Sequence, residues 1–482
     1  MRVLICKFLL LSLFFHIPFA GAWAEAALHG KIKKPNILLF LVDDFGARDL
    51  SCYGSSFYET PAIDRLALEG QRYIQAYAAH PRCVPSRYGL FTGRFPARDG
   101  CPGKTYNIAS QTRTLAEALK EGGYATFFAG KWHLGKSAAE MPDAQGFDIN
   151  IAGGAAGAPR SYFAPYNQSK NPNHKAAKID GLDDAPKDEY LTDRLTDETV
   201  RFLEKHAESD QPKPFFAVLA HYAVHTPIEA KAEDSKYFEN KRGPVGPEKF
   251  MLRDGSTKIE QDNATYAAMI RSTDQSLERV LRTLDKLKLT ENTLIFLTSD
   301  HGGLSNRGAQ SNRPLATSNL PLRAGKGHLY EGGIRVPFIV RWPGVAPVGQ
   351  TNNTIVTGSD LYATCLAAAG LEPEPEHHLD SVNILPAIKG EAMEREAILW
   401  HSPRPRPSST GDTASSALRV GNYKLIKFYF PEVHYELYDL YTDPNETKDL
   451  SQLQVSVYKQ LIHRLNSKLA EVNAIEPHTG KK

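Results

Sequence analysis

Short apolar runs alternate with amphipathic segments along much of the chain, and this alternation constrains the fold more than any other feature. Asn36–Val42 is continuously apolar and of strand length, as expected for a strand buried on both faces of a sheet. Further runs of this kind are Ala125–Ala129, Pro214–Ala220 and Thr293–Thr298. The helical segments between them are Ala62–Glu69, Thr114–Glu121, Thr192–Lys205 and Tyr266–Leu287. The pattern predicts an α/β fold with a large, mostly parallel sheet flanked by helices.

The composition and the pattern of the sequence change after about residue 385. Residues 402–416 are rich in proline, arginine and serine, which is typical of an extended or mobile loop. Short strands are expected at 417–420, 423–429 and 435–439, and a helix at 455–472. We therefore predict a large α/β domain over residues 25–385 and a small C-terminal α+β subdomain, an antiparallel sheet plus a helix, over 386–482.

The first 24 residues have the order of a secretory signal peptide. Arg2 and Lys7 precede and border an apolar run, which leads to the small residues Ala22 and Ala24. The run is too short to span a membrane, so we expect cleavage after Ala24 and a secreted or periplasmic protein without a membrane span. Removal of Arg2 and Lys7 lowers the number of basic side chains from 57 to 55, which equals the number of acidic side chains. This balance argues against nucleic acid as a main partner.

Polar side chains directly follow the predicted strands. They are Asp43, Asp44, Lys131, His133, His225, Asp300 and His301. Because ligands of open α/β sheets bind beyond the carboxyl ends of the strands, we expect these side chains to converge on one edge. Adjacent carboxylates repel each other unless a cation lies between them, so Asp43, Asp44 and Asp300 predict a metal site. Oxygen ligands favour calcium or magnesium.

The densest motif of the chain begins at Cys83. Of the five cysteines, Cys6 falls in the signal segment, and the others form neither a disulfide framework nor a zinc-type pair. Residues 83–94 read CVPSRYGLFTGR. Taken alone, Cys83 could be a buried cysteine where a loop enters a helix. The whole string, however, resembles without a mismatch the signature C-x-P-S-R-x-x-L-x-T-G-R of the formylglycine-dependent sulfatases, which belong to the alkaline phosphatase superfamily.

The resemblance implies that a maturation enzyme oxidises Cys83 to formylglycine, an aldehyde that hydrates to a geminal diol. One hydroxyl would attack sulfur and displace the alcohol, and the second would expel sulfate as the aldehyde re-forms. A serine could form the first ester but could not release it. Arg87 lies one helical turn after Cys83, so its guanidinium could hold the diol and brace a metal carboxylate.

Two further segments and a histidine resemble the same family. Residues 130–135 read GKWHLG, which implies that Lys131 and His133 bind the sulfate and the diol; at i and i+2 they face the same side of an extended segment. Residues 325–337 read GKGHLYEGGIRVP, which implies that Lys326 contacts sulfate. His225 resembles the histidine that protonates the leaving alcohol, with His221 as the alternative. A serine that contacts formylglycine is expected within 153–161, whereas Glu331 is expected to be structural.

The resemblance also implies a ligand set for the metal. It assigns Asp43, Asp44, Asp300 and His301 to calcium, together with the formylglycine made from Cys83. The imidazole of His301 leaves the identity of the metal open, and magnesium is the alternative to calcium.

These observations together predict hydrolysis of a sulfate ester in a cationic pocket formed by Arg87, Lys131, Lys326 and the metal. Secretion and the aromatic- and arginine-rich C-terminal segment favour a sulfated carbohydrate as substrate. The formylglycine-generating (sulfatase-maturating) enzyme is the expected protein partner. Two alternatives remain open: a phosphomonoester or phosphonate ester hydrolase on the same scaffold, and a non-catalytic sulfoglycan-binding protein with an unconverted Cys83.

Overall fold

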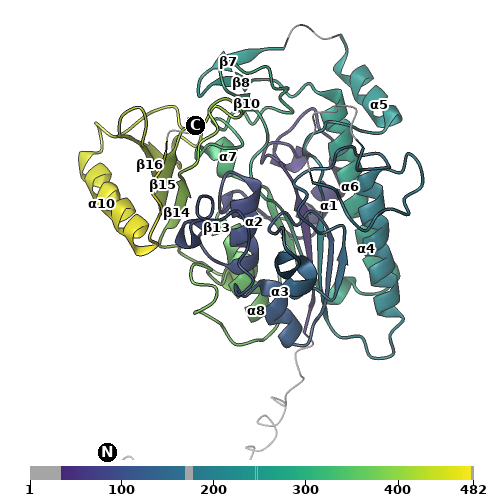
Figure 1. Cartoon of the computed structure of the whole chain (residues 1–482). Coiled ribbons are helices and arrows are strands. Elements are labelled where there is room, and N and C mark those ends of the chain that lie inside the picture. Colours follow the sequence, from purple (N-terminus) through teal and green to yellow (C-terminus); the bar gives the residue numbers. More distant parts are fainter. Residues whose placement is uncertain (1–33, 169–176, 245, 247, 479–482) are drawn as a thin grey trace, which may run out of the picture. The chain divides into compact units, whose positions relative to one another are not determined.

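Strand β1 (Asn36–Val42) has the predicted bounds and lies within an eight-stranded sheet, as the computed structural model shows (Figure 1). All seven of its residues are buried. The even-numbered residues from Leu38 to Val42 pack into one hydrophobic core, and the odd-numbered ones from Ile37 to Leu41 pack into another. Helices therefore cover both faces of the sheet, which explains why this strand is continuously apolar.

The strand order of this sheet is β12-β2-β11-β9-β1-β6-β4-β5, and among these strands only β11 runs antiparallel to its neighbours. Their bounds are β12 Gln350–Asn352, β2 Gln71–Tyr73, β11 Phe338–Arg341, β9 Thr293–Ser299, β6 Phe215–Ala220, β4 Ala125–Gly130 and β5 Ile149–Ile151. The predicted mixed, mostly parallel sheet is thus confirmed. The sequence did not indicate β2, β5, β11 and β12, because three or four residues are too few to show a period.

Helices divide between the two faces of the sheet. The face that holds the even-numbered residues of β1 is covered by α1 (Pro61–Leu68), α4 (Leu191–Ala207) and α6 (Ala264–Lys286). The other face is covered by α2 (Cys83–Thr92), α3 (Leu115–Glu121), α8 (Leu361–Ala368) and α9 (Leu385–Ile388). Two more helices are α5 (Ala232–Arg242), which packs on α6, and the short α7 (Glu331–Ile334).

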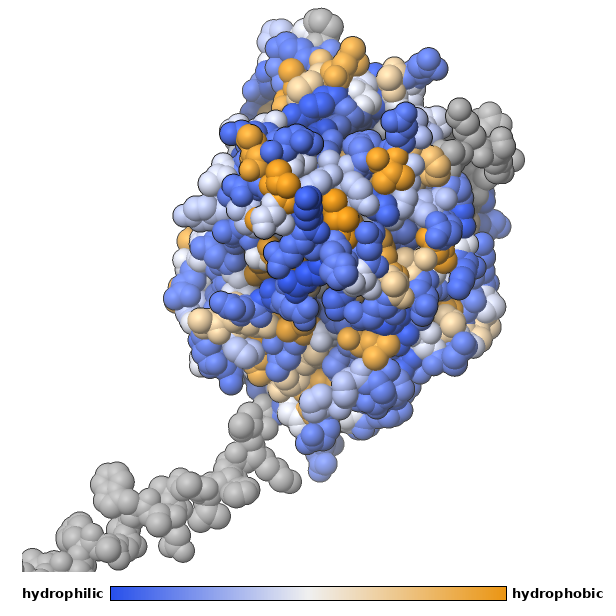
Figure 2. Space-filling view, turned by 90° about the vertical axis from the view of Figure 1, so that its left-hand side faces the viewer, coloured by the Kyte–Doolittle hydropathy of each residue, from blue (hydrophilic) through white to orange (hydrophobic). Residues whose placement is uncertain are grey.

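The C-terminal sheet has four antiparallel strands in chain order. They are β14 Ile398–Ser402, β15 Ser415–Val420, β16 Tyr423–Phe428 and β17 His434–Asp439, followed by α10 Val455–Glu471. One face packs on the main body, where Trp400 meets Tyr77, and the other packs on α10 through Leu418 and Leu465. The predicted antiparallel sheet plus helix is confirmed. Figure 2 views the molecule from the side on which α10 lies in Figure 1, and that side is mostly hydrophilic with scattered apolar groups.

Two small sheets complete the described structure, which covers residues 34–168, 177–244, 246 and 248–478. One contains β7 (Phe250–Leu252), β8 (Ser256–Lys258) and β10 (Asn306–Arg307), and in the other β3 (Ala76–Tyr77) pairs with β13 (Val356–Thr357). The predicted signal peptide lies outside the described residues, and the predicted domain boundary near residue 385 stays a prediction. Within the described ranges, no helix combines the length and the apolar character needed to cross a membrane.

Candidate active site

Four neighbouring strands of the large sheet, β9, β1, β6 and β4, end at the same edge. The residues that follow them, together with Cys83, Arg87 and Lys326, form one cluster of contacting side chains. Its members are Asp43, Asp44, Cys83, Arg87, Lys131, His133, His225, Asp300, His301 and Lys326. The structure therefore brings together all the residues that the sequence analysis assigned to catalysis and to the metal.

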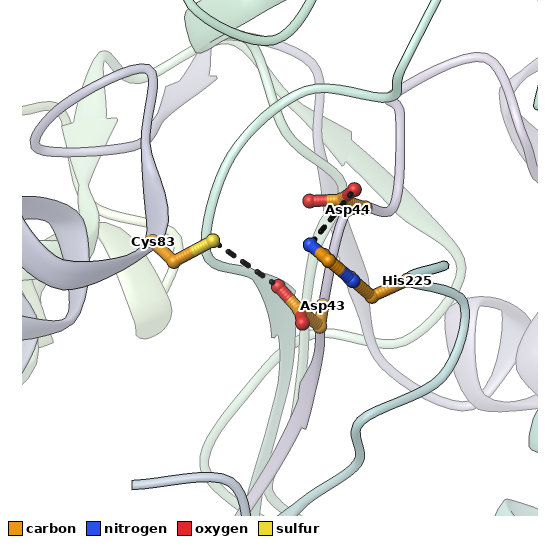
Figure 3. Close-up of side chains that lie close together, drawn as sticks. All are labelled: Asp43, Asp44, Cys83 and His225. Carbon is orange, nitrogen blue, oxygen red and sulfur yellow. Dashed lines mark hydrogen bonds and ion pairs between the residues drawn. The ribbon is translucent and has the colours of Figure 1, made fainter. Parts of the chain in front are cut away.

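Cys83 is the first residue of α2, and its side chain is buried within this cluster. Its Sγ lies 3.1 Å from Nε2 of His301. It also lies 3.7 Å from Oδ1 of Asp43 (Figure 3). Burial acts to raise the pKa of the thiol, but Lys131, Lys326 and His301 outweigh it and hold this pKa well below its ordinary value. The surroundings of Cys83 thus favour negative charge at its side-chain atom.

Acidic and imidazole groups crowd around Cys83. Ligand atoms of Asp43, Cys83, Asp300 and His301 all lie within 4.8 Å of one another. Oδ1 of Asp44 is 3.4 Å from Nε2 of His301. Burial, followed by the nearby charge of Asp300, raises the pKa of Asp43 well above its ordinary value. Such mutual repulsion is what a divalent cation relieves, and the carboxylate oxygens suit calcium or magnesium, so these residues fit a metal.

Each of the three carboxylates also has a close basic partner. Lys131 pairs with Asp43, Nζ of Lys326 lies 2.5 Å from Oδ1 of Asp44, and Nε of Arg87 donates to Oδ2 of Asp300 at 2.9 Å. The cluster is balanced, with three acids against three permanent cations. Nη2 of Arg87, however, has no hydrogen-bond partner in the described part of the chain. A buried donor of this kind is available to a bound oxygen atom.

His133 faces the hollow in front of Cys83 from the loop after β4. Its φ of 61° places a non-glycine residue in the left-handed region, as is common at functional sites. A Cβ atom on Gly157 would lie 2.4 Å from its ring, so only glycine fits there. The Nδ1 atom of His133 has no hydrogen-bond partner among the described residues.

The two histidines near the end of β6 have different surroundings. Nδ1 of His225 is 2.8 Å from the carbonyl oxygen of Thr226, while its Nε2 lies 3.8 Å from Oδ2 of Asp44 and faces the site (Figure 3). Burial, followed by the positive charge of Lys326, lowers the pKa of His225 to about 3. His221 instead directs Nε2 to Oγ of Ser276 at 2.9 Å and does not line the hollow.

A hollow of about 420 Å³ opens in front of Cys83, which is a size typical of small-molecule sites. His133, His225 and Lys326 line it, and so do four side chains that the sequence analysis missed: Arg82, Tyr106, Arg313 and Arg406. Arg82 directly precedes the signature at Cys83 but is not part of it, and Tyr106 and Arg313 lie in segments without a recognisable motif. For Arg406, the only signal was the arginine- and proline-rich stretch in which it lies. Within 153–161, Ala155, Gly157 and Ala158 line the hollow. Ser161 instead donates to Oε2 of Glu229 at 3.0 Å and lines a different hollow.

Comparison with known protein families assigns the chain to a family. The sulfatase family model matches residues 35–371, and the model for the C-terminal part of N-sulphoglucosamine sulphohydrolase matches residues 324–475. The chain belongs to the sulfatase family. It is accordingly a sulfuric ester hydrolase, as the sequence predicted.

Individual relatives agree with this membership. The sulfatase is 32% identical over 422 residues to the N-acetylgalactosamine-6-sulfatase of Canis lupus familiaris, covering 82% of this chain and 72% of that protein. It is 29% identical over 514 residues to the N-acetylgalactosamine-6-O-sulfatase of Bacteroides thetaiotaomicron, covering 90% and 93%. Among solved structures, Ps i-CgsB in complex with k-i-k-neocarrahexaose has a TM-score of 0.74, with 30% identity and 93% and 95% coverage. The phosphonate monoester hydrolase of Agrobacterium radiobacter shares the fold, with a TM-score of 0.66 at 20% identity and coverage of 91% and 96%.

Proposed function

We propose that this sulfatase removes sulfate from a carbohydrate, using a formylglycine diol made from Cys83 beside a bound calcium ion. One observation carries the proposal. The Cys83 side chain lies within 3.7 Å of both Asp43 and His301, and it lines the same hollow as Lys326 and His225. A nucleophile, a set of metal ligands, a sulfate-binding cation and a proton carrier therefore meet at one point.

In this proposal, Asp43, Asp44, Asp300 and His301 hold the metal, with magnesium as the alternative to calcium. A bound divalent cation supplies positive charge beside the nucleophile and the sulfate oxygens. The three acids and three permanent cations of the site already balance, so a divalent cation leaves the site with an excess of positive charge. That excess suits a sulfate ester and the charge that develops on its oxygens during transfer.

The side chains of the protein itself perform the remaining tasks. Lys131, Lys326 and Nη2 of Arg87, which has no hydrogen bond among the described residues, bind and orient the sulfate and the nucleophile. The carbonyl oxygen of Thr226 accepts from Nδ1 of His225, so Nε2 is the atom that faces the leaving alcohol. Nε2 donates its proton from the imidazolium form of the ring, which the negative charge of a bound sulfate favours. The ring of His133 contacts the side chain of Cys83, and His133 takes the proton from the second hydroxyl when sulfate is released.

Two relatives support a carbohydrate substrate. The proteins of Canis lupus familiaris and Bacteroides thetaiotaomicron carry names that specify sulfated N-acetylgalactosamine. The leader-like first 24 residues support a secreted or periplasmic location. The signature around Cys83 supports a sulfatase-maturating enzyme as the protein partner.

The experiment combines mass spectrometry with kinetics on the full-length protein made in a host with a maturation enzyme. The peptide that contains Cys83 should have the mass of formylglycine, and turnover of 4-nitrophenyl sulfate should exceed that of 4-nitrophenyl phosphate. Exhaustive chelation should abolish activity and calcium should restore it. A cysteine mass in fully active protein would refute the nucleophile, and faster phosphate turnover would favour the phosphoester alternative. Restoration by zinc alone would refute the oxygen-ligand interpretation of the metal site.

A further inference from the structure

The hollow in front of Cys83 has more positive charge than the scissile sulfate needs. Lys326 and three arginines, Arg82, Arg313 and Arg406, line it, and no aspartate or glutamate among the described residues does so. Lys326 is one of the proposed sulfate contacts. The three arginines belong to no part of the proposed reaction.

The three arginines differ in their partners. Arg82 forms a buried ion pair with Asp412, so its charge is neutralised. Among the described residues, the guanidinium of Arg313 donates to uncharged oxygen alone, from Nη1 to Oγ of Ser409 at 2.9 Å. The guanidinium of Arg406 has no hydrogen bond or ion pair within the described ranges. Two guanidinium groups are thus left without an acid at the wall of the hollow.

The backbone around these two arginines is held in place. A Cβ atom on Gly308 would lie 2.3 Å from the carbonyl oxygen of Pro407, so the two loops touch backbone to backbone and glycine is required. Arg82 also donates to the carbonyl oxygen of Arg404. Nε2 of His328 lies 2.9 Å from the carbonyl oxygen of Thr410. The segment expected to be an extended or mobile loop is therefore anchored to the main body on both sides of Arg406.

We propose that Arg313 and Arg406 bind a second anionic group of the substrate, a carboxylate or a second sulfate close to the sulfate that is cleaved. A guanidinium presents paired N–H donors that match either anion. Tyr106, 43% exposed, lines the same hollow and offers an aromatic face to the sugar ring between the two anions. This inference rests on the proposed function, because it takes the site beside Cys83 as the place of the scissile sulfate.

The test measures binding without turnover, in the full-length Cys83→Ala protein by calorimetry. The probes are 4-nitrophenyl sulfate, a monosulfated disaccharide with a hexuronate, the carboxyl-reduced form of that disaccharide, and a neutral-sugar disaccharide with two sulfates. Arg313→Gln and Arg406→Gln are each added to this background. Arg282→Gln is the matched control, because Arg282 is exposed on α6, has no ion pair among the described residues and does not line the hollow.

Each pocket variant should raise the Kd of a dianionic disaccharide on the order of tenfold more than the Kd of 4-nitrophenyl sulfate. Arg282→Gln should raise neither. A selective loss with the hexuronate but not with its reduced form identifies a carboxylate, and a selective loss with the disulfated probe identifies a second sulfate. Equal losses for monoanionic and dianionic probes, or no loss for any probe, would overturn the proposal.

The same probes separate this inference from the proposed function. If mature wild-type protein fails to hydrolyse 4-nitrophenyl sulfate while binding still depends selectively on the two arginines, the function is wrong and the second-anion site stands. If no sulfated probe binds to the Cys83→Ala protein at all, both are overturned.

Discussion

Two buried ion clusters of this sulfatase are connected by the short segment from Lys326 to Glu331. The active-site cluster contains Asp43, Asp44, Asp300, Arg87, Lys131 and Lys326, and the C-terminal cluster contains Glu331, Lys424 and Glu446. Lys326 and Glu331 are five residues apart, and each contributes to a different cluster. Both clusters take charged groups out of water, yet only one has the features of a catalytic site.

The difference lies in how the polar atoms are used. In the C-terminal cluster, every carboxylate oxygen has a partner: Lys424 lies 2.9 Å from Glu331 and 2.7 Å from Glu446, Tyr77 donates to Glu331 at 2.8 Å, and the Glu331 amide donates to Glu446 at 2.7 Å. In the active-site cluster, Nη2 of Arg87 has no hydrogen bond and only a 3.9 Å ion pair with Asp43, and Lys326 borders the hollow in front of Cys83. Burial of charge alone does not distinguish a site from a structural contact, whereas loosely paired charges next to a hollow that a ligand can enter do.

The largest expected effect tests the active-site cluster at its centre. Cys83→Ser should lower turnover by on the order of ten-thousand-fold or more, because serine forms the sulfate ester but has no second hydroxyl to release it. Mass spectrometry after incubation with substrate should show one persistent sulfate on Ser at this position. Cys52→Ser, at a cysteine outside the cluster, should remain active and unsulfated. Steady turnover by the Cys83 variant would refute the formylglycine mechanism.

The next largest effect tests the C-terminal cluster. Lys424→Met leaves Glu331 and Glu446 buried without their shared cation, so the free energy of unfolding should fall by about 3–5 kcal/mol. Lys459→Met on α10 should change it by less than about 0.5 kcal/mol, since Lys459 is exposed and has no ion pair in the described structure. Denaturant titration gives both values. If the folded Lys424 variant keeps its stability but loses sulfatase activity, the division between the clusters is wrong.

A smaller effect separates proton transfer from charge stabilisation within the active site. His225→Ala should slow hydrolysis of sugar sulfates on the order of a hundredfold, because sugar alcohols need a proton to leave. The loss should be far smaller with 4-nitrophenyl sulfate, whose phenolate departs readily as an anion. Lys326→Ala should harm both substrates alike. Equal losses for both ester classes in His225→Ala would remove His225 as the proton donor.

The smallest expected effect concerns pH and the C-terminal cluster. Burial, opposed by Lys424 and reinforced by Glu331, raises the pKa of Glu446 to about 7. The folded state therefore binds more protons than the unfolded state between pH 4.5 and 7, and this contribution to stability is lost as pH rises through that window. Glu446→Gln should reduce the change of the free energy of unfolding between pH 4.5 and 7 by on the order of 1–3 kcal/mol, measured by denaturant titration across this window. The exposed control Glu391→Gln should leave the slope unchanged, and an unchanged slope in Glu446→Gln would contradict the raised pKa.

The sequence by itself determined the features that depend on local pattern. Continuous apolar runs such as Asn36–Val42 identified strands buried on both faces, and the end of each run located polar residues at one edge of the sheet. The string from Cys83 to Arg94 indicated the family, because its residues are contiguous. Strands of three or four residues, such as β2 and β12, could not be recognised, because they form only by pairing with distant segments.

Only the tertiary structure decided which distant groups meet. The pairing of Glu331 with Lys424 joins residues 93 positions apart, and Arg313 reaches Ser409 across 96 positions. Likewise, His221 and His225 are equivalent as strand-end histidines in the sequence, but only His225 lines the hollow. The physical reason is that charge, burial and hydrogen bonding in a folded chain depend on neighbours in space, and loops carry no periodicity that would announce those neighbours in advance.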